Sequence, residues 1–350
     1  MASGSLSGRA QTVLGPVAPE GLGITLMHEH LLVDLRRVFD EPADARGRAL
    51  SRQQVTLSNL AWVTKNWASS LDNLVLDDPE LAAAEVMLFK DAGGGTIVDV
   101  NTADLVRHPP VLRDISRRCG VNIVMGCGYY HAGFHPADMA ERSEEELADE
   151  IAADILVGVD GTGIRAGIIG EVGCSWPLHP NEAKSLRASA RAQRETGAAI
   201  TIHPGRHVDA PFEILDVLER AGADPARVVM GHIERTGFDA DTLLRLARRG
   251  CCLEYDWFGE VRPAYPHGRV DVPSDGERIR EIAFLIAAGH GSQVVVSHDV
   301  CFKMRLAAYG GPGYEHIPRY VAEWMRAMGI AGDEVRRILI ENPRRILAFP

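Results

Sequence analysis

The chain has 350 residues, of which 46% are hydrophobic and 24% are charged, and its formal net charge is −11 at pH 7. This composition is typical of folded globular proteins and excludes a disordered or fibrous chain. The excess of acidic residues argues against nucleic acid as a partner, because surfaces that bind nucleic acid are basic.

Eight short runs of β-forming residues recur along the chain, and an amphipathic stretch follows most of them. The β runs are residues 23–28, 95–101, 121–128, 166–173, 198–203, 227–232, 251–256 and 293–299. The expected helices cover residues 79–92, 143–157, 181–196, 211–221, 239–249 and 274–288. Each β run is apolar up to its C-terminal end, which is typical of a parallel strand that is covered on both faces.

This alternation predicts the α/β class and a (β/α)8 TIM barrel, with residues 1–350 in a single domain. A short β extension at residues 11–17 precedes the first strand, and a helical segment at residues 51–67 follows that strand. An open doubly wound sheet is the alternative, but it would have a glycine-rich phosphate-binding turn after its first strand. The sequence has His28-Glu29-His30 at that place instead.

Six side chains that can bind metal ions lie at or near the ends of the β runs. Side chains alternate across a strand, so His28 and His30 share one face while Glu29 points to the other. Four such residues belong to later runs: Glu171, His203, His232 and Asp299. Because the C-terminal ends of barrel strands converge on one mouth, we expect the six groups to meet there. They exceed the needs of one tetrahedral ion and suit two divalent ions that share a carboxylate and a hydroxide.

The order of these residues along the strands resembles the binuclear metal pattern of the phosphotriesterase family, within the amidohydrolase superfamily. Residues 170–178, 253–256 and 309–314 are similar in particular to its branch of phosphotriesterase-related proteins, and the likeness spans nearly the whole chain. The best-known members bridge their metals with a carboxylated lysine, whereas this sequence has Glu171, as the related branch does. A glutamate can bridge two ions without carbon dioxide.

The resemblance implies a role for each matched residue. The hydroxide between the ions would attack a C=O or P=O centre, and Asp299 would act as the catalytic residue that accepts its proton and passes it to the leaving group. The expected cofactors are two divalent ions, Zn²⁺ by default, with Mn²⁺, Co²⁺ or Fe²⁺ as alternatives. The more buried ion is assigned to His28, His30 and Asp299, the more exposed ion to His203 and His232, and the bridge to Glu171.

Four further residues are candidates for substrate binding. Arg206 and Arg235 each come three residues after an expected metal ligand, so both guanidinium groups are expected near the mouth. Each either pairs with a nearby carboxylate or clamps an anionic group of the substrate, which a planar guanidinium grips bidentately. The rings after the third and seventh strands, Tyr129 and Trp257 with their neighbours Tyr130 and Phe258, either wall the substrate pocket or pack against barrel loops. Two carboxylates on one face of the seventh strand are expected to hydrogen-bond inward to rim residues: Glu254 and Asp256.

Together these features predict a binuclear-metal-dependent hydrolase that acts on a small molecule. The expected anion clamp favours a small N-acyl amide of an anionic amine, of the N-acetyltaurine or N-acyl amino acid type. The alternative is a phosphotriesterase, or a lactonase or carboxylesterase, that uses the same water. A small-molecule-binding protein without catalysis is more remote, because such a protein would be expected to have lost ligands, and all six positions hold ligating residues.

The termini and the cysteines indicate where the protein acts. The first residues lack the basic and then apolar pattern of a secretion signal, and no apolar run is long enough to cross a membrane. Six cysteines are scattered without a Cys-x-x-Cys pair, which is typical of reduced thiols. We therefore expect a cytoplasmic protein that does not contact membranes, and the resemblance implies a homodimer.

Overall fold

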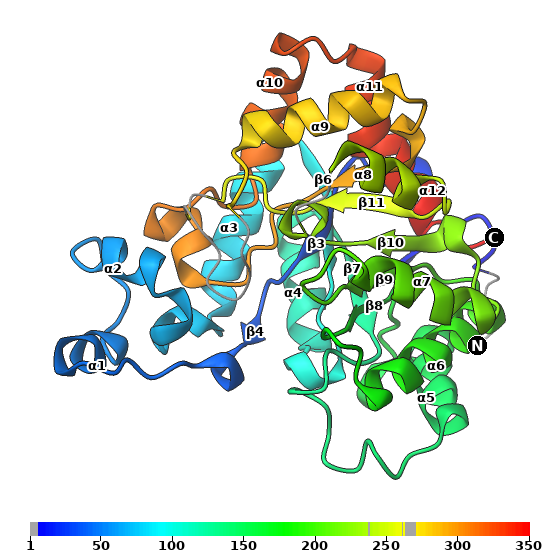
Figure 1. The fold of residues 1–350 in the computed structure, drawn as a ribbon, viewed down its shortest axis with the longest axis horizontal. Helices are drawn as coiled ribbons and strands as arrows, with labels where there is room; N and C mark the ends of the chain where they lie inside the picture. The colour runs from blue at the N-terminus through cyan, green and yellow to red at the C-terminus, as the bar shows by residue number, and fades with distance from the viewer. Residues whose placement is uncertain (1–5, 237–238, 261, 263–270) are drawn as a thin grey trace.

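The computed structural model describes residues 6–236, 239–260, 262 and 271–350. Within them, eight parallel strands are hydrogen-bonded in their order along the chain, and β12 contacts β3, so the sheet nearly closes into a barrel (Figure 1). The strands are β3 (Ile24–Glu29), β6 (Gly94–Asp99), β7 (Asn122–Cys127), β8 (Ile168–Gly173), β9 (Ile200–His203), β10 (Val228–Met230), β11 (Cys252–Tyr255) and β12 (Val294–Val296). The expected TIM barrel is therefore confirmed, and each expected strand overlaps an observed one.

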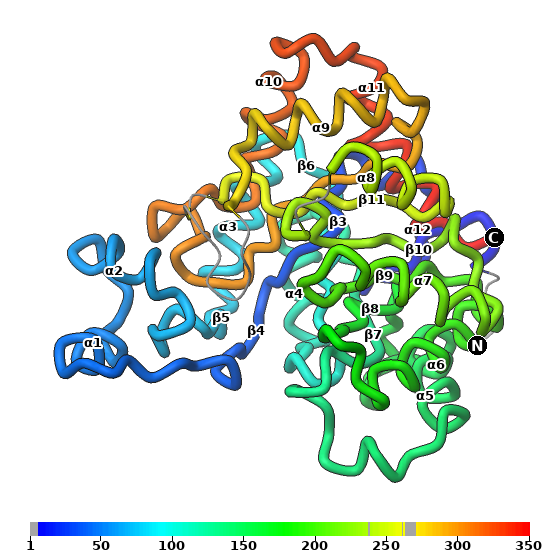
Figure 2. Tube along the Cα trace, viewed as in Figure 1, coloured from blue at the N-terminus to red at the C-terminus, as the bar shows by residue number. Residues whose placement is uncertain are grey.

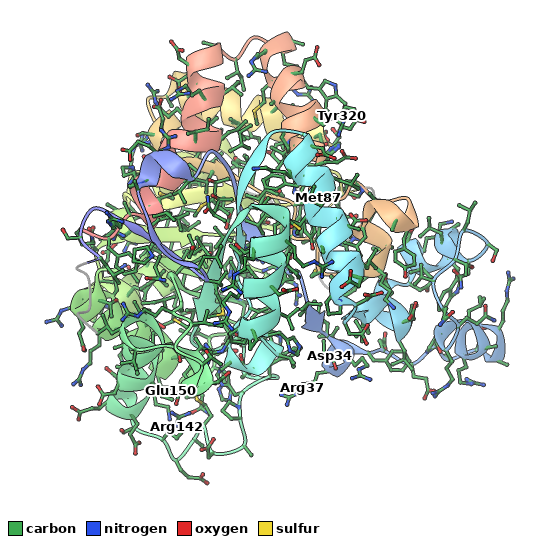
Figure 3. All side chains as sticks on the ribbon, turned by 180° about the vertical axis from the view of Figure 1, so that it is seen from behind. Asp34, Arg37, Met87, Arg142, Glu150 and Tyr320 are labelled. Carbon is green, nitrogen blue, oxygen red and sulfur yellow. The ribbon has the colours of Figure 1, made fainter. Side chains whose placement is uncertain are left out.

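Helices cover the outside of the barrel, and their starts follow from the sequence. They are α3 (Pro79–Asp91), α4 (Pro109–Cys119), α5 (Glu144–Leu156), α6 (Pro180–Thr196), α7 (Ala210–Arg220), α8 (Ala240–Ala247) and α9 (Asp275–Ala287). Ser143 forms a capping box with Glu146 at the start of α5, and Ser274 forms one with Glu277 at the start of α9. Figure 3 shows α3, which carries the exposed Met87, beside α4. None of the described helices is long and apolar enough to cross a lipid bilayer.

The segment that follows β3 differs from the single helical stretch expected at residues 51–67. It contains β4 (Val33–Asp34), α1 (Ala45–Ser51), α2 (Leu60–Lys65) and β5 (Val75–Leu76), and Figure 1 shows α1 and α2 projecting from one side of the barrel. Between the two short helices, the side chain of Asn59 accepts a hydrogen bond from the Thr56 N–H (2.8 Å) and donates one to the Gln54 carbonyl (2.9 Å). These local bonds compete with helical ones, so the expected extent of the helix was wrong.

The two ends of the chain close the N-terminal end of the barrel. The expected β extension is an antiparallel hairpin of β1 (Ala10–Thr12) and β2 (Gly15–Val17). The C-terminal helices are α10 (Ala322–Ala327), α11 (Gly332–Arg336) and α12 (Asn342–Leu347), with π-helical turns at Ile317–Val321 and Arg337–Glu341. Ala10 pairs with Ala348, so the hairpin lies beside the end of α12 (Figure 2).

The apolar filling of the barrel leaves its C-terminal end for chemistry. One buried cluster combines Ala10 of β1 and Ile346 of α12 with residues of the barrel strands or next to them: Met27, Val98, Val124, Ile168, Ala199, Val229, Cys252 and Val295. This buried apolar cluster fills the end of the barrel near both chain ends, and the polar groups lie at the opposite end of the strands, where barrel enzymes place their active sites.

Candidate metal centre

The six residues expected as ligands meet at the C-terminal end of the barrel, around the carboxylate of Glu171. This group in β8 lies 3.4 Å from Nε2 of His28 and 3.3 Å from Nε2 of His30. It also lies 2.8 Å from Nδ1 of His203 and 3.7 Å from Nε2 of His232. Four imidazoles, from β3, β9 and the residues just after β3 and β10, therefore surround one buried carboxylate.

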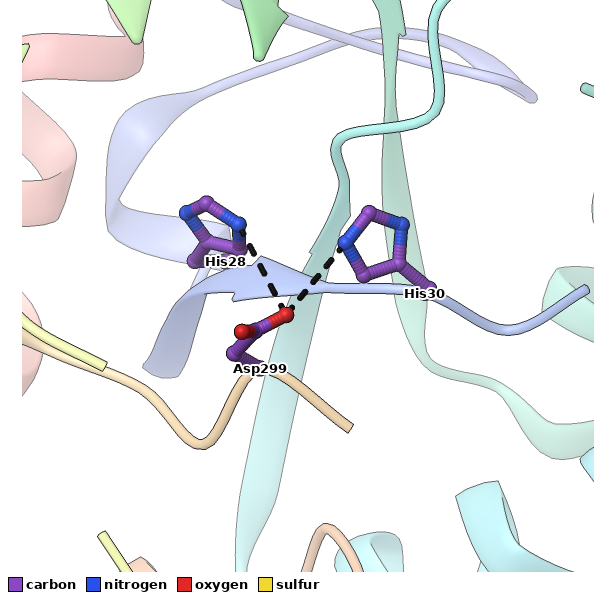
Figure 4. Close-up of side chains that lie close together, drawn as sticks. All are labelled: His28, His30 and Asp299. Carbon is purple, nitrogen blue, oxygen red and sulfur yellow. Dashed lines mark ion pairs between the residues drawn. The ribbon is translucent and has the colours of Figure 1, made fainter. Parts of the chain in front are cut away.

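Asp299 completes this group from the segment that follows β12. Its Oδ1 lies 3.5 Å from Nε2 of His30 and 3.9 Å from Nε2 of His28, and Figure 4 shows the two imidazoles and the carboxylate side by side. The other oxygen, Oδ2, accepts a hydrogen bond of 3.2 Å from the indole N–H of Trp257. The indole therefore fixes one oxygen of the carboxylate and leaves the other facing the histidines.

A second layer of polar side chains orients three of the imidazoles. Nδ1 of His30 contacts Oδ1 of Asn101 at 2.8 Å, and Nδ1 of His232 contacts Oδ1 of Asp256 at 2.8 Å. Nδ1 of His28 lies 3.3 Å from Oε2 of Glu254. A proton held on each Nδ1 leaves the lone pair of Nε2 directed to the centre of the cluster, as metal-binding histidines require. The inward hydrogen bonding expected for Glu254 and Asp256 is thus observed.

The charges of the cluster favour a cation between its carboxylates. Burial alone would raise the pKa of Glu171, but His28 and His203 hold that pKa well below its usual value. Burial would lower the pKa of His30, but hydrogen bonds with Asp299 and Glu171 raise it to about 10. Positive charge is therefore stabilised at this point, whether protons or metal ions supply it.

The donor set fits divalent metal ions. Nε2 of His28 is buried and has no hydrogen-bond partner among the described residues, although it faces two carboxylates. A buried nitrogen of this kind is costly unless something binds to it. His28 also belongs to three groups of side chains whose ligand atoms lie within 4.8 Å of one another: one with His30 and Asp299, one with Glu171 and His232, and one with Glu254 and Asp256.

Two of the expected ligands have an unusual backbone. His232 has a φ of 54° and Asp299 also has a φ of 54°, both in the left-handed region. Residues other than glycine rarely adopt this conformation, and it costs on the order of 1–3 kcal/mol each unless the surroundings hold it. Such strain is common where a side chain must point to a functional site.

A cavity of about 70 Å³ opens beside this cluster. The rings of Tyr130, Trp257 and Phe302 line it, together with the guanidinium groups of Arg235 and Arg262. A neighbouring cavity of about 270 Å³ shares His131, His203 and Arg206 with the first. The site therefore offers a small inner space with aromatic and cationic walls.

The residues expected to bind substrate have different surroundings. Arg235 is buried, and its Nη1 lies 3.2 Å from Nε2 of His203 while its Nη2 donates to the Pro204 carbonyl at 2.5 Å. Arg206 is exposed at the rim of the cavity. Trp257 lines the cavity and contacts Asp299 as described above.

Tyr129 does not line this cavity, and the neighbouring Tyr130 lines it instead. The guanidinium of Arg142 lies over the Tyr129 ring, 5.6 Å from its centroid, on the side of the barrel labelled with Arg142 and Glu150 in Figure 3. The hydroxyl of Tyr130 lies 3.1 Å from Nδ1 of His203, and burial raises the pKa of this phenol well above its usual value. Arg262 was not predicted from the sequence. Its position shortly after the seventh strand was a signal that could have pointed to the barrel mouth.

The chain is similar to known proteins along nearly its whole length. A sequence model of the Phosphotriesterase family matches residues 8–347. An N-acetyltaurine hydrolase from Xenopus tropicalis is 44% identical over 347 residues, which cover 99% of each protein, and one from Dictyostelium discoideum is 42% identical and covers 98% of each. Among solved structures, a resiniferatoxin-binding protein from Rhodobacter sphaeroides has a TM-score of 0.94 and 37% identity, over 97% of this chain and 95% of that one.

Proposed function

Because the chain belongs to the phosphotriesterase family of metal-dependent hydrolases, we propose that it hydrolyses a small N-acyl amide of an anionic amine, with N-acetyltaurine as its substrate. The observation that carries this proposal is the convergence of four histidines and two carboxylates at the barrel mouth. The N-acetyltaurine hydrolases that match nearly the whole chain support the substrate.

Two divalent cations would occupy the site, with zinc as the first candidate. Imidazole nitrogen and carboxylate oxygen suit zinc, and they also suit Mn²⁺, Co²⁺ and Fe²⁺. When bound, the cations would activate a water molecule and polarise the carbonyl group of the substrate. One cation would be held by His28, His30 and Asp299, the other by His203 and His232, with Glu171 shared between them.

Asp299 would move the proton in this reaction. Its Oδ1 faces the cluster, so it can accept a proton from the attacking water as the new C–O bond forms. When the C–N bond breaks, the same carboxyl group returns the proton to the leaving nitrogen, so acetate and taurine are released. The indole of Trp257, which donates to Oδ2, would keep the carboxylate in this orientation.

The cavity supports a small, anionic substrate. Its volume of about 70 Å³ favours an acetyl group over a long acyl chain. Three arginines line the cavity, Arg206, Arg235 and Arg262, and cationic walls of this kind favour a substrate with a negative charge. The protonated hydroxyl of Tyr130 would be available to donate a hydrogen bond to the substrate.

A direct assay tests the proposal. The protein would be purified without chelators, its transition-metal content measured by mass spectrometry, and the release of taurine from N-acetyltaurine followed. N-acetyl amino acids, an acyl-homoserine lactone and paraoxon would be assayed alongside. We expect about two metal ions per chain and the highest kcat/KM for N-acetyltaurine.

Matched variants separate chemistry from folding. Asp299→Asn should lower kcat by at least about 1,000-fold, because the proton acceptor is lost. Asp216→Asn makes the same chemical change on the surface of α7, where Asp216 pairs with Arg249, and should leave turnover unchanged. A preference for the lactone or for paraoxon would favour the alternative hydrolases. Stoichiometric metal without any turnover would favour a binding protein.

A further inference from the structure

We infer that Arg262 is the residue that binds the anionic group of the substrate and thereby determines specificity for sulfonates or carboxylates. This inference rests on the proposed function, because it names the part of the same site that recognises the amine end of the substrate. It goes beyond the rim arginines that the sequence singled out.

Arg262 is held by aromatic rings that belong to the cavity wall. Its guanidinium carbon lies 5.2 Å from the ring centroid of Trp67, 5.3 Å from that of Trp257 and 5.8 Å from that of Phe302. The residue is only 6% exposed, and it lines the cavity together with the same three rings. A guanidinium that is restrained and shielded in this way loses little entropy when it binds an anion.

Two buried arginines and one carboxylate meet at this wall. Nη2 of Arg262 donates to Oε2 of Glu260 at 2.6 Å, and Nη1 of Arg305 donates to the same oxygen at 2.9 Å. Burial would raise the pKa of Glu260, but the two arginines lower it to about 2, so the carboxylate is ionised. Among the described residues, Glu260 is the one carboxylate that forms an ion pair with either guanidinium. Two buried guanidinium groups therefore contact this one carboxylate, and Arg262 also lines the cavity, where it would attract an anionic group of the substrate.

The other cationic side chains of the cavity are less suited to this role. Both terminal nitrogens of Arg235 are engaged, one with the imidazole of His203 and the other with the Pro204 carbonyl. That arrangement makes Arg235 a positioning residue for His203. Arg206 is exposed, and water screens its charge, so an ion pair there contributes little binding energy.

Arg262 also lies at a suitable place relative to the reacting groups. Trp257 contacts Arg262 through its ring face and donates its N–H to Asp299. One indole therefore connects the cationic wall with the carboxylate that would transfer the proton. In N-acetyltaurine an ethylene linker separates the amide nitrogen from the sulfonate. A molecule of this length that lies along the indole would place its amide near Asp299 and its sulfonate near Arg262.

Two substrates that differ in the terminal group test the inference. N-acetyltaurine carries a sulfonate, and N-acetylethanolamine carries a neutral hydroxyl on the same linker. Arg262→Gln should lower kcat/KM for N-acetyltaurine by about 10- to 100-fold, mainly through KM, because a buried charge-assisted interaction is lost. Activity on N-acetylethanolamine should change less than about threefold, and Arg262→Lys should give an intermediate loss for the sulfonate.

Control variants and a binding readout make the test independent of folding. Arg191→Gln removes an exposed guanidinium that pairs with Glu145 and should change neither substrate. In Arg262→Gln, Glu260 keeps its ion pair with Arg305, so the variant is expected to fold, which its melting temperature checks. Methanesulfonate should raise the melting temperature of the wild-type protein, and this shift should disappear in Arg262→Gln.

The outcomes distinguish this inference from the proposed function. An equal loss for both substrates would mean a structural role for Arg262 and would overturn the inference. A selective loss in Arg206→Gln with none in Arg262→Gln would move the anion site to the rim and would overturn it as well. If the wild-type protein hydrolyses neither substrate, the proposed function fails, and the methanesulfonate shift alone decides whether Arg262 binds anions.

Discussion

The layer of carboxylates behind the histidines should control how tightly the metal ions bind, and Asp256→Asn tests this. Asp256 is fully buried next to the end of β11. One of its oxygens contacts Nδ1 of His232 and the other accepts the backbone N–H of His232, each at 2.8 Å. Its Oδ2 also lies 3.6 Å from Nδ1 of His28. The asparagine keeps the size of the side chain but places an N–H group against one of these N–H donors.

The expected effect follows from these two bonds. Loss of an outer partner of a ligating histidine typically lowers metal affinity by about 10- to 100-fold. Since a factor of ten corresponds to about 1.4 kcal/mol, the change in binding free energy should be about 1.4–2.7 kcal/mol. One hydrogen bond to a charged group has a similar value of about 1.5–3 kcal/mol, so the loss of one of the two bonds accounts for it.

Metal affinity would be measured on metal-free protein by competition with a chromophoric chelator, and kcat would be measured at saturating metal. We expect Asp256→Asn to need about 10- to 100-fold more free Zn²⁺ for half-maximal activity. Asp154→Asn is the matched control, because Asp154 is a buried carboxylate that pairs with Arg107 away from the site. Unchanged metal affinity in Asp256→Asn, with full occupancy, would refute the orienting role of this layer.

Three other perturbations follow from the same contacts. Dialysis against a chelator should abolish turnover, and Zn²⁺, Mn²⁺ or Co²⁺ should restore it, as measured by taurine release. Trp257→Phe should lower kcat by about tenfold, because Asp299 loses one hydrogen bond, and steady-state kinetics on N-acetyltaurine checks this. Glu182→Gln should lower the free energy of unfolding by about 2–3 kcal/mol, since its buried carboxylate accepts N–H bonds from Ala132, Ser175 and His179; chemical denaturation measures the loss.

The barrel and the inner cluster could be predicted because both depend on local patterns. A parallel strand covered on two faces reads as a mostly apolar run, and in several of these runs a histidine or a carboxylate stands at or near the C-terminal end. His203 ends β9, and His232 and Asp299 follow β10 and β12 closely, so their positions were visible without any knowledge of contacts. The barrel then brings together residues that are distant in sequence.

The outer contacts could not be predicted because nothing local encodes them. His28 and Glu254 are 226 residues apart, and the contact depends on β3 and β11 lying on either side of β12 in the nearly closed barrel. The same holds for Arg262, whose partners Trp67 and Phe302 come from two other loops. Tyr130 lines the cavity and Tyr129 does not, and the reason for this is different. Gly128 has a φ of 93°, and this turn ends the alternation of side chains after β7.

The strained backbone connects the two layers of the site. The left-handed conformation of His232 is held by the bond from its N–H to Asp256, and that of Asp299 by the bond of 3.1 Å from its N–H to the His28 carbonyl. Asp256 contacts His232 and His28, and His28 is itself an expected ligand. The backbone of one expected ligand, His28, therefore holds the backbone of another, Asp299. A change at Asp256 therefore acts on His232 twice, through the imidazole and through its backbone. For this reason Asp256→Asn should weaken metal binding more than Asn101→Asp, which alters a contact to the imidazole of His30 and a bond to the Leu32 carbonyl but no bond to the backbone of an expected ligand. Equal effects of the two variants on metal affinity would argue against a contribution from the backbone.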